Sequence, residues 1–174
     1  MHTLKQLSLA AFAVVALCSA SALHAGERAA QVSPEDFVEE ASAKGIAEIE
    51  TGKLALEKAT SPEVKEFAQS MVDDHTKANQ QLSTLATQKE LEVSDDAELI
   101  NQAKALVLKL RGESSFDKAY MNNQVMAHQQ TIELFQKASQ SEDAEIAAFA
   151  KEMLPKLEHH LQMAEKINKE IPEQ

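Results

Sequence analysis

The chain has 174 residues and a formal net charge of −11, with 28 acidic and 17 basic side chains. Such an acidic balance disfavours binding to nucleic acid and to anionic lipid surfaces. The single cysteine, Cys18, lies within the first 25 residues, which have the pattern of a cleavable leader. We therefore expect a mature protein without disulfides, thiolate catalysis or cysteine-bound metals.

Residues 1–25 read as a secretory signal peptide. Lys5 supplies a short positive region, the run Leu7–Leu17 is apolar, and small residues follow. Cleavage after Ala25 is favoured because charged residues begin two positions later, and cleavage after Ala22 is the alternative. The apolar run is shorter than the roughly 20 residues that a membrane-spanning helix needs.

Residues 26–174 are expected to form one all-α domain that is exported to the periplasm. The whole sequence has only four glycines, four prolines and no tryptophan, and it is rich in strong helix formers. Removal of Lys5 with the leader changes the charge to 16 − 28 = −12. The mature chain is expected to contain no transmembrane segment and to bind no nucleic acid.

Two helix starts with the same chemistry lie in the first half of the chain. Ser33 precedes Pro34, and Ser61 precedes Pro62, so each pair provides an N-cap followed by proline in the first turn. The pattern predicts one helix over Pro34–Lys58 and a second from Pro62 to about Lys89. Because the turn between them is short, the two helices are expected to be antiparallel.

The second half of the chain predicts three further helices. An apolar stripe over residues 99–110 indicates a shorter connecting helix that Gly112 ends. Two long helices are predicted over Ser115–Ala138 and Ala144–Lys169. Pro155 lies inside the last of these and should bend it, because it removes one backbone hydrogen bond.

The long helices are related by an internal repeat. Residues 37–60 can be laid on residues 116–139 without a gap, and Glu145–Leu154 is a near-copy of Glu63–Val72. The sequence therefore predicts two similar helical hairpins joined by a long connection. A connection of that length lets the third long helix run parallel to the second, as in ferritin-like four-helix bundles.

Several segments form a recognisable set of motifs: Phe37-Val38 with Gly45–Ala55, Val64–Ala68, Met71–Asn79, Phe116–Tyr120, and Leu154-Pro155 with His160-Leu161. Together they resemble the family called domain of unknown function 4142. The resemblance covers nearly the whole mature chain and implies an exported bacterial protein with a ferritin-like fold. No activity is established for the family. This sequence departs from the family at Ala127, where similar sequences usually carry an acid before the following histidine.

Four polar residues stand out on the apolar stripes of the long helices. His75, His128 and His160 each occupy a stripe position on a different helix, and Glu48 interrupts a stripe of small residues on the first helix. Imidazole and carboxylate groups that meet in a bundle core suit zinc, iron, copper or manganese. We therefore name these four residues as candidate metal ligands. Glu50 and Asp74 are candidates for residues that orient the ligands by hydrogen bonding, and Asp74 would act on His75.

Two features of the sequence limit this metal hypothesis. No Glu-x-x-His pair precedes any of the three histidines, so a ferritin-type di-iron centre is not expected. Counted from the turn near residue 140, His160 lies about six residues further along the bundle than His128, or about 9 Å at about 1.5 Å per residue. The alternative is that the histidines are ordinary core residues, hydrogen-bonded to Glu48, Glu50, Tyr120 or water.

Methionine and glycine on the same stripes also allow two interpretations. The methionines are typical of core packing, and copper binding with histidine is the alternative. Gly45 and Gly52 lie inside a helix, where glycine lowers stability, so they predict a close approach to a neighbouring helix.

These patterns lead to one functional interpretation and two alternatives. No phosphate-binding glycine loop, Gly-x-Ser-x-Gly elbow or thiol nucleophile is present, so we expect no catalytic activity. The first interpretation is an exported, non-catalytic helical-bundle protein that acts as a binding or stress-associated module. The second is a transition-metal-binding protein with a His/Glu site in its core, and the third is a protein that acts through a homodimer or an envelope protein partner.

Overall fold

A computed structural model describes residues 32–91, 106 and 116–172 of the chain. It contains four long helices: α1 (Pro34–Lys58), α2 (Pro62–Gln88), α4 (Phe116–Ala138) and α5 (Ala144–Glu170). These bounds agree with the predicted helices within one residue. The predicted leader and the predicted connecting helix, except Leu106, lie outside the described residues.

The helix starts follow from the local sequence. The Ser33 hydroxyl accepts a hydrogen bond from the backbone N–H of Asp36 at 3.0 Å, and the Ser61 hydroxyl accepts one from Val64 at 3.3 Å. Asp143 caps α5 in the same way, through two backbone N–H groups at 3.1 Å. Each cap satisfies amide groups that the first turn of a helix leaves unpaired.

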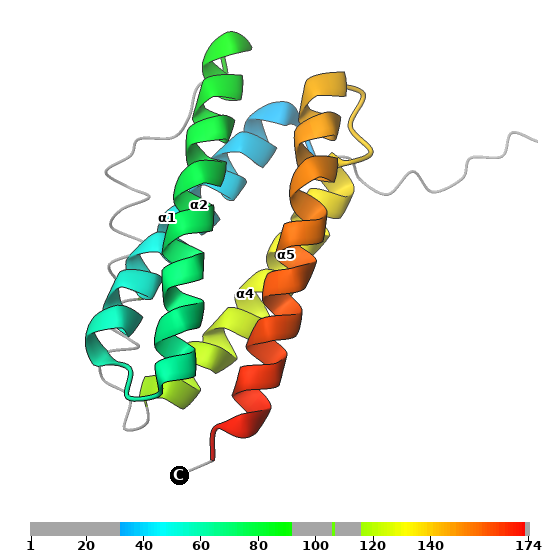
Figure 1. The fold of residues 1–174 in the computed structure, drawn as a ribbon. Helices are drawn as coiled ribbons and strands as arrows, with labels where there is room; N and C mark the ends of the chain where they lie inside the picture. Colours follow the sequence, from blue (N-terminus) through cyan, green and yellow to red (C-terminus); the bar gives the residue numbers. More distant parts are fainter. Residues whose placement is uncertain (1–31, 92–105, 107–115, 173–174) are drawn as a thin grey trace, which may run out of the picture.

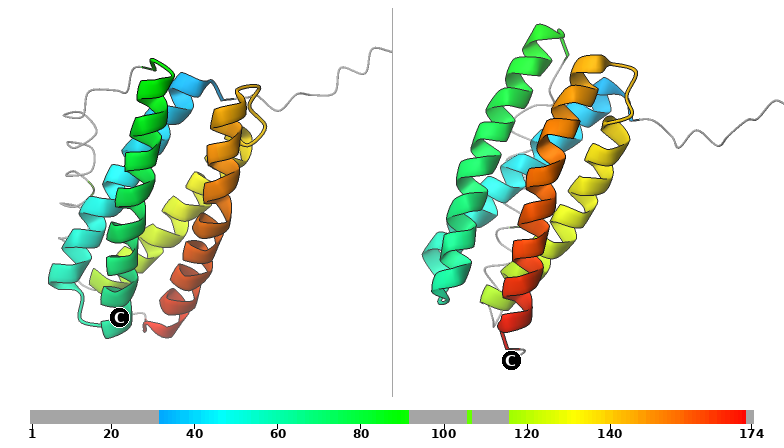
Figure 2. Two further views of the ribbon diagram at one scale, coloured as in Figure 1. Left: turned by 45° about the horizontal axis from the view of Figure 1, so that its top comes forward. Right: turned by 45° about the vertical axis from the view of Figure 1, so that its right-hand side comes forward.

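The helices form two antiparallel hairpins that pack into one bundle (Figures 1 and 2). α1 packs along α2 and α4 packs along α5, while α1 also faces α4 and α2 also faces α5. α2 and α4 run in the same direction, so α4 begins at the end of the bundle opposite to where α2 ends (Figure 1). This arrangement confirms the predicted ferritin-like bundle of two similar hairpins. None of the described helices has the length and apolar composition needed to cross a bilayer.

Two glycines allow α1 to lie close to α2. A Cβ atom on Gly45 would collide with the side chain of Asn79. A Cβ atom on Gly52 would lie 2.9 Å from Cγ2 of Val72 and 3.2 Å from the carbonyl oxygen of Ala68. The predicted close approach at both glycines is therefore confirmed.

The carboxylate of Asp117 joins the two hairpins at one end of the bundle. It accepts hydrogen bonds from the backbone N–H of Thr60 at 3.0 Å, the Thr60 hydroxyl at 2.7 Å and the backbone N–H of Ser61 at 2.8 Å. Asp117 is 8% exposed, so water could not easily replace its carboxylate as the hydrogen-bond acceptor for these donors. The start of α4 is thereby fixed to the turn between α1 and α2.

The interior consists of two apolar clusters with a polar layer between them. One cluster contains Phe37, Leu82 and Phe135, and the other contains Phe67 and Met71. Each of the four helices contributes to both clusters and carries at least one buried polar residue between its two contributions. This polar layer positions the candidate site.

Candidate metal centre

The polar layer contains the four residues that the sequence named as candidate ligands. Glu48 of α1, His75 of α2, His128 of α4 and His160 of α5 are 4%, 7%, 1% and 3% exposed, respectively. Burying polar groups inside an apolar core is unfavourable unless each group finds a partner. The contacts of each side chain therefore decide what the layer can do.

The three histidines converge into one cluster, which we call the histidine cluster. The ring centroids of His75 and His128 are 5.7 Å apart, those of His75 and His160 are 5.7 Å apart, and those of His128 and His160 are 5.5 Å apart. One nitrogen from each ring lies within 4.8 Å of the other two. Three nitrogens that bind one ion with bonds of about 2.0–2.1 Å lie roughly 3.4–3.6 Å from one another, so each nitrogen would have to move inward by up to about 0.7 Å to share an ion.

His128 and His160 meet although their backbones lie at different levels along the bundle axis, because their side chains point toward each other. In an α-helix each Cα–Cβ bond tilts toward the helix N-terminus. Because α4 and α5 are antiparallel, the side chains of His128 and His160 lean toward each other along the bundle axis. Counting backbone levels alone therefore overestimated their separation.

One nitrogen of each imidazole is buried without a hydrogen-bond partner among the described residues: Nε2 of His75, Nε2 of His128 and Nδ1 of His160. The other nitrogen of His128, Nδ1, lies 2.9 Å from the carbonyl oxygen of Gln124. The other nitrogen of His160, Nε2, lies 3.0 Å from the Asp74 carboxylate. Since both of these oxygens accept hydrogen bonds, the facing nitrogens carry the protons, and in the neutral rings of His128 and His160 the unpartnered nitrogen is left with a lone pair.

Burial keeps two of these imidazoles uncharged. Desolvation, followed by repulsion from the neighbouring imidazoles, lowers the pKa of His75 from 6.5 to about 3. Desolvation and repulsion from His128 lower the pKa of His160 to about 4, although the Asp74 carboxylate opposes this. Both rings are therefore neutral near pH 7, and neutral imidazole is the form that binds metal ions.

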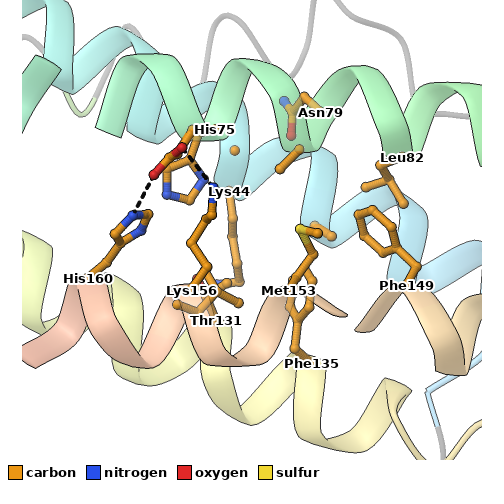
Figure 3. A pocket seen from close by; sticks show the side chains of 15 residues that line it. Lys44, His75, Asn79, Leu82, Thr131, Phe135, Phe149, Met153, Lys156 and His160 are labelled. Carbon is orange, nitrogen blue, oxygen red and sulfur yellow. Dashed lines mark hydrogen bonds and ion pairs between the residues drawn. The ribbon is translucent and has the colours of Figure 1, made fainter. Parts of the chain in front are cut away.

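Asp74 is hydrogen-bonded to His160, whereas the sequence led us to expect a contact with His75. Neighbouring residues on a helix point in different directions, so Asp74 reaches across to α5 instead of to the adjacent His75. Its carboxylate accepts hydrogen bonds from His160 and, at 2.8 Å, from Lys156 (Figure 3). Burial raises the pKa of Asp74, but the hydrogen bonds from Lys156 and His160 outweigh it and hold that pKa below its usual value.

Lys156 was not predicted, yet the sequence carries a signal for it. It precedes His160 by four residues, so both side chains lie on one face of α5. Glu50, the other residue expected to support a ligand, lies on the surface, where it pairs with Lys53 at 2.8 Å. It does not contact the histidine cluster.

Glu48 lies in the polar layer but outside the histidine cluster. Its carboxylate accepts a hydrogen bond from Nε2 of Gln124 at 2.7 Å. Burial raises the pKa of Glu48, while His128 and Gln124 oppose this effect. Gln124 is completely buried and precedes His128 by four residues on the same face of α4. The hydroxyl of Tyr120, an expected partner of the histidines, has no hydrogen-bond partner among the described groups.

Comparison with known proteins places the chain in a family and identifies structures with a similar fold. The sequence matches the model of the family described as Domain of unknown function (DUF4142) over residues 19–167, and the chain belongs to this family. No curated protein matches the sequence.

Three solved structures of CopM resemble this one. They are CopM in the Ag-bound form obtained by soaking, in the Cu(I)-bound form and in the Cu(II)-bound form, with TM-scores of 0.67, 0.67 and 0.65. Each is 16% identical in sequence and covers 80% of this chain and 97 or 98% of CopM. At this identity the likeness shows a shared helical-bundle fold.

Proposed function

We propose that this member of the DUF4142 family binds one transition-metal ion, with copper preferred, through the imidazoles of His75, His128 and His160. The proposal rests on three buried nitrogens that lack partners among the described residues and belong to rings that each place one nitrogen within 4.8 Å of the other two. A buried polar atom without a partner typically costs about 1–3 kcal/mol. Three of them at one place are hard to explain as core packing, and a shared cation would satisfy all three.

This proposal favours the second functional interpretation of the sequence over the first. A non-catalytic module with satisfied core histidines would show protein partners for these nitrogens. Instead, the partners that the structure provides lie on the outer side of two rings, at Gln124 for His128 and at Asp74 for His160. Outer hydrogen bonds of this kind fix the tautomer and orientation of metal-binding histidines.

The donor set favours copper among the metals that the sequence allowed. Neutral imidazoles suit copper and zinc, and divalent copper binds a given nitrogen site more tightly than zinc does. The two nearby carboxylates, of Glu48 and Asp74, already accept hydrogen bonds from other residues. With uncharged donors in a desolvated site, a singly charged ion such as Cu(I) costs less to bury than a doubly charged one. CopM, which shares the fold, has been obtained with Cu(I), Cu(II) and Ag bound.

Each residue of the site then has a defined part. The three imidazoles would hold the ion, Asp74 keeps the proton of His160 on Nε2, and the Gln124 carbonyl keeps the proton of His128 on Nδ1. A bound copper ion supplies a one-electron centre or a Lewis acid. Together with the leader-like residues 1–25, this supports a role in metal handling outside the cytoplasm.

Metal analysis of the mature protein without a histidine tag tests the proposal. The protein is incubated with Cu(I) under reducing conditions, and separately with Zn(II), beside the variants His75→Leu and His159→Leu. His159 is exposed, so its variant is a matched control. We expect one copper per chain in the wild type and in His159→Leu, and none retained by His75→Leu against a competing chelator. Absence of bound metal in the wild type, or equal retention by His75→Leu, would contradict the proposal.

A further inference from the structure

A small cavity, partly open to solvent, adjoins the histidine cluster, and residues of all four helices line it. Two residues of the cluster, His75 and His160, line it, and most of the remaining lining is apolar, including Ala78. Figure 3 shows Leu82 and Met153 among these apolar residues. Its volume is about 30 Å³. A single water molecule needs about 10–15 Å³, so the space suits a ligand of two heavy atoms.

The charged groups at this cavity already have partners. Lys156 donates to Asp74 at 2.8 Å, and Lys44 lies 3.5 Å from the carboxylate of Glu40. Asp74 in turn accepts a hydrogen bond from His160. An incoming ligand therefore meets apolar side chains and neutralised charges, which favours an uncharged molecule over an anion.

The cavity also adjoins two of the three residues that would hold the proposed ion. Three protein donors leave one open position on a four-coordinate metal ion. The unpartnered nitrogens of His75 and His160 belong to residues that line the cavity, and these residues are 7% and 3% exposed. Thr131, which follows His128 by one turn, lines it as well. The cavity thus has contributions from all three helices that carry the histidines.

We propose that this cavity is the binding site for an uncharged diatomic molecule, which enters the open position of the metal held by the histidine cluster. The inference rests on the proposed metal site. Carbon monoxide is the appropriate probe for the Cu(I) form. Its carbon lone pair forms a dative bond to Cu(I); no bond breaks, no proton moves, and the copper remains Cu(I).

The first experiment uses the Cu(I)-loaded mature protein, with copper content measured before carbon monoxide is added. Infrared spectroscopy of the C–O stretch then reports ligand binding. Ala78→Leu places a larger side chain in the cavity, and Ala119→Leu is the control, because Ala119 is a similarly half-buried alanine that packs against the other apolar cluster. We expect one carbon monoxide per copper in the wild type and in the control. In Ala78→Leu we expect at least tenfold weaker binding with unchanged copper content.

A second measurement needs no mutation. The carbon of tert-butyl isocyanide binds Cu(I) as carbon monoxide does, but its branched head exceeds the volume of the cavity. We expect the wild type to bind carbon monoxide and to exclude the isocyanide. Loaded copper that takes no carbon monoxide would overturn the inference, as would equal carbon monoxide binding by Ala78→Leu or binding of the isocyanide. A wild type that takes up no copper would overturn the proposed metal site itself, so the two failures are distinguishable.

Discussion

Replacing His75 with leucine should make the metal-free protein more stable. Nε2 of His75 is buried, and no described group bonds to it, so removing it relieves an unfavourable burial of about 1–3 kcal/mol. Leucine has a similar size, and the position is well buried: His75 is only 7% exposed, next to an apolar cluster that already contains Leu82. We therefore expect the free energy of unfolding to rise by about 1–3 kcal/mol. For a domain of this size, each kcal/mol raises Tm by roughly 2–4 °C.

Urea unfolding followed by circular dichroism, in a chelator at pH 7.5, measures this change. The exposed His159→Leu variant should remain within about 0.5 kcal/mol of the wild type. With copper at 1,000 times its Kd, the wild type should gain about 4 kcal/mol and His75→Leu should gain nothing, so their order reverses. A loss of more than about 1 kcal/mol in metal-free His75→Leu would refute the reasoning. It would show that His75 is a satisfied core residue.

Three further predictions concern the neighbours and the charge of the site. Asp74→Ala should weaken copper binding by about 10–100-fold, because it removes the acceptor that orients His160; an unchanged affinity in a chelator competition would contradict this role. Asp117→Ala should lower the free energy of unfolding by about 2–3 kcal/mol, because it leaves the three donors of the α1–α2 turn unpaired; a loss below about 1 kcal/mol in urea would show that water replaces the carboxylate. The metal-free wild type should lose stability as the pH falls from about 6.5 toward 4. In the folded protein the pKa values are about 3 for His75 and about 4 for His160, so both rings stay neutral over most of this range, whereas the same residues in the unfolded chain take up protons. The slope is at most about 1.4 kcal/mol per pH unit for each histidine. Parallel pH curves for the wild type and His75→Leu would contradict this assignment.

The fold could be predicted because its determinants are local in the sequence. Ser33-Pro34 and Ser61-Pro62 mark helix starts through hydrogen bonds that span only three residues. The internal repeat adds the relation between hairpins, because similar stripes bury similar faces. Gly45 and Gly52 even indicated which face of α1 approaches another helix.

The details of the site could be predicted only in part, because they depend on contacts between helices. The stripe positions identified His75, His128 and His160, since a polar residue on an apolar face is visible in the sequence. Whether the rings meet depends on how side chains lean across antiparallel helices, which a count of residues does not contain. The partners Gln124 and Asp74 are likewise set by geometry, because each lies among several polar residues that the sequence alone does not distinguish.

The histidine cluster contains residues of both helical hairpins. One histidine comes from the α1–α2 hairpin and two come from the α4–α5 hairpin. An ion held by all three would act as a removable cross-link between the halves, midway between the two apolar clusters. Amide hydrogen exchange would then slow in both hairpins at once when the ion binds. Binding of a single ion would thus stabilise the entire bundle.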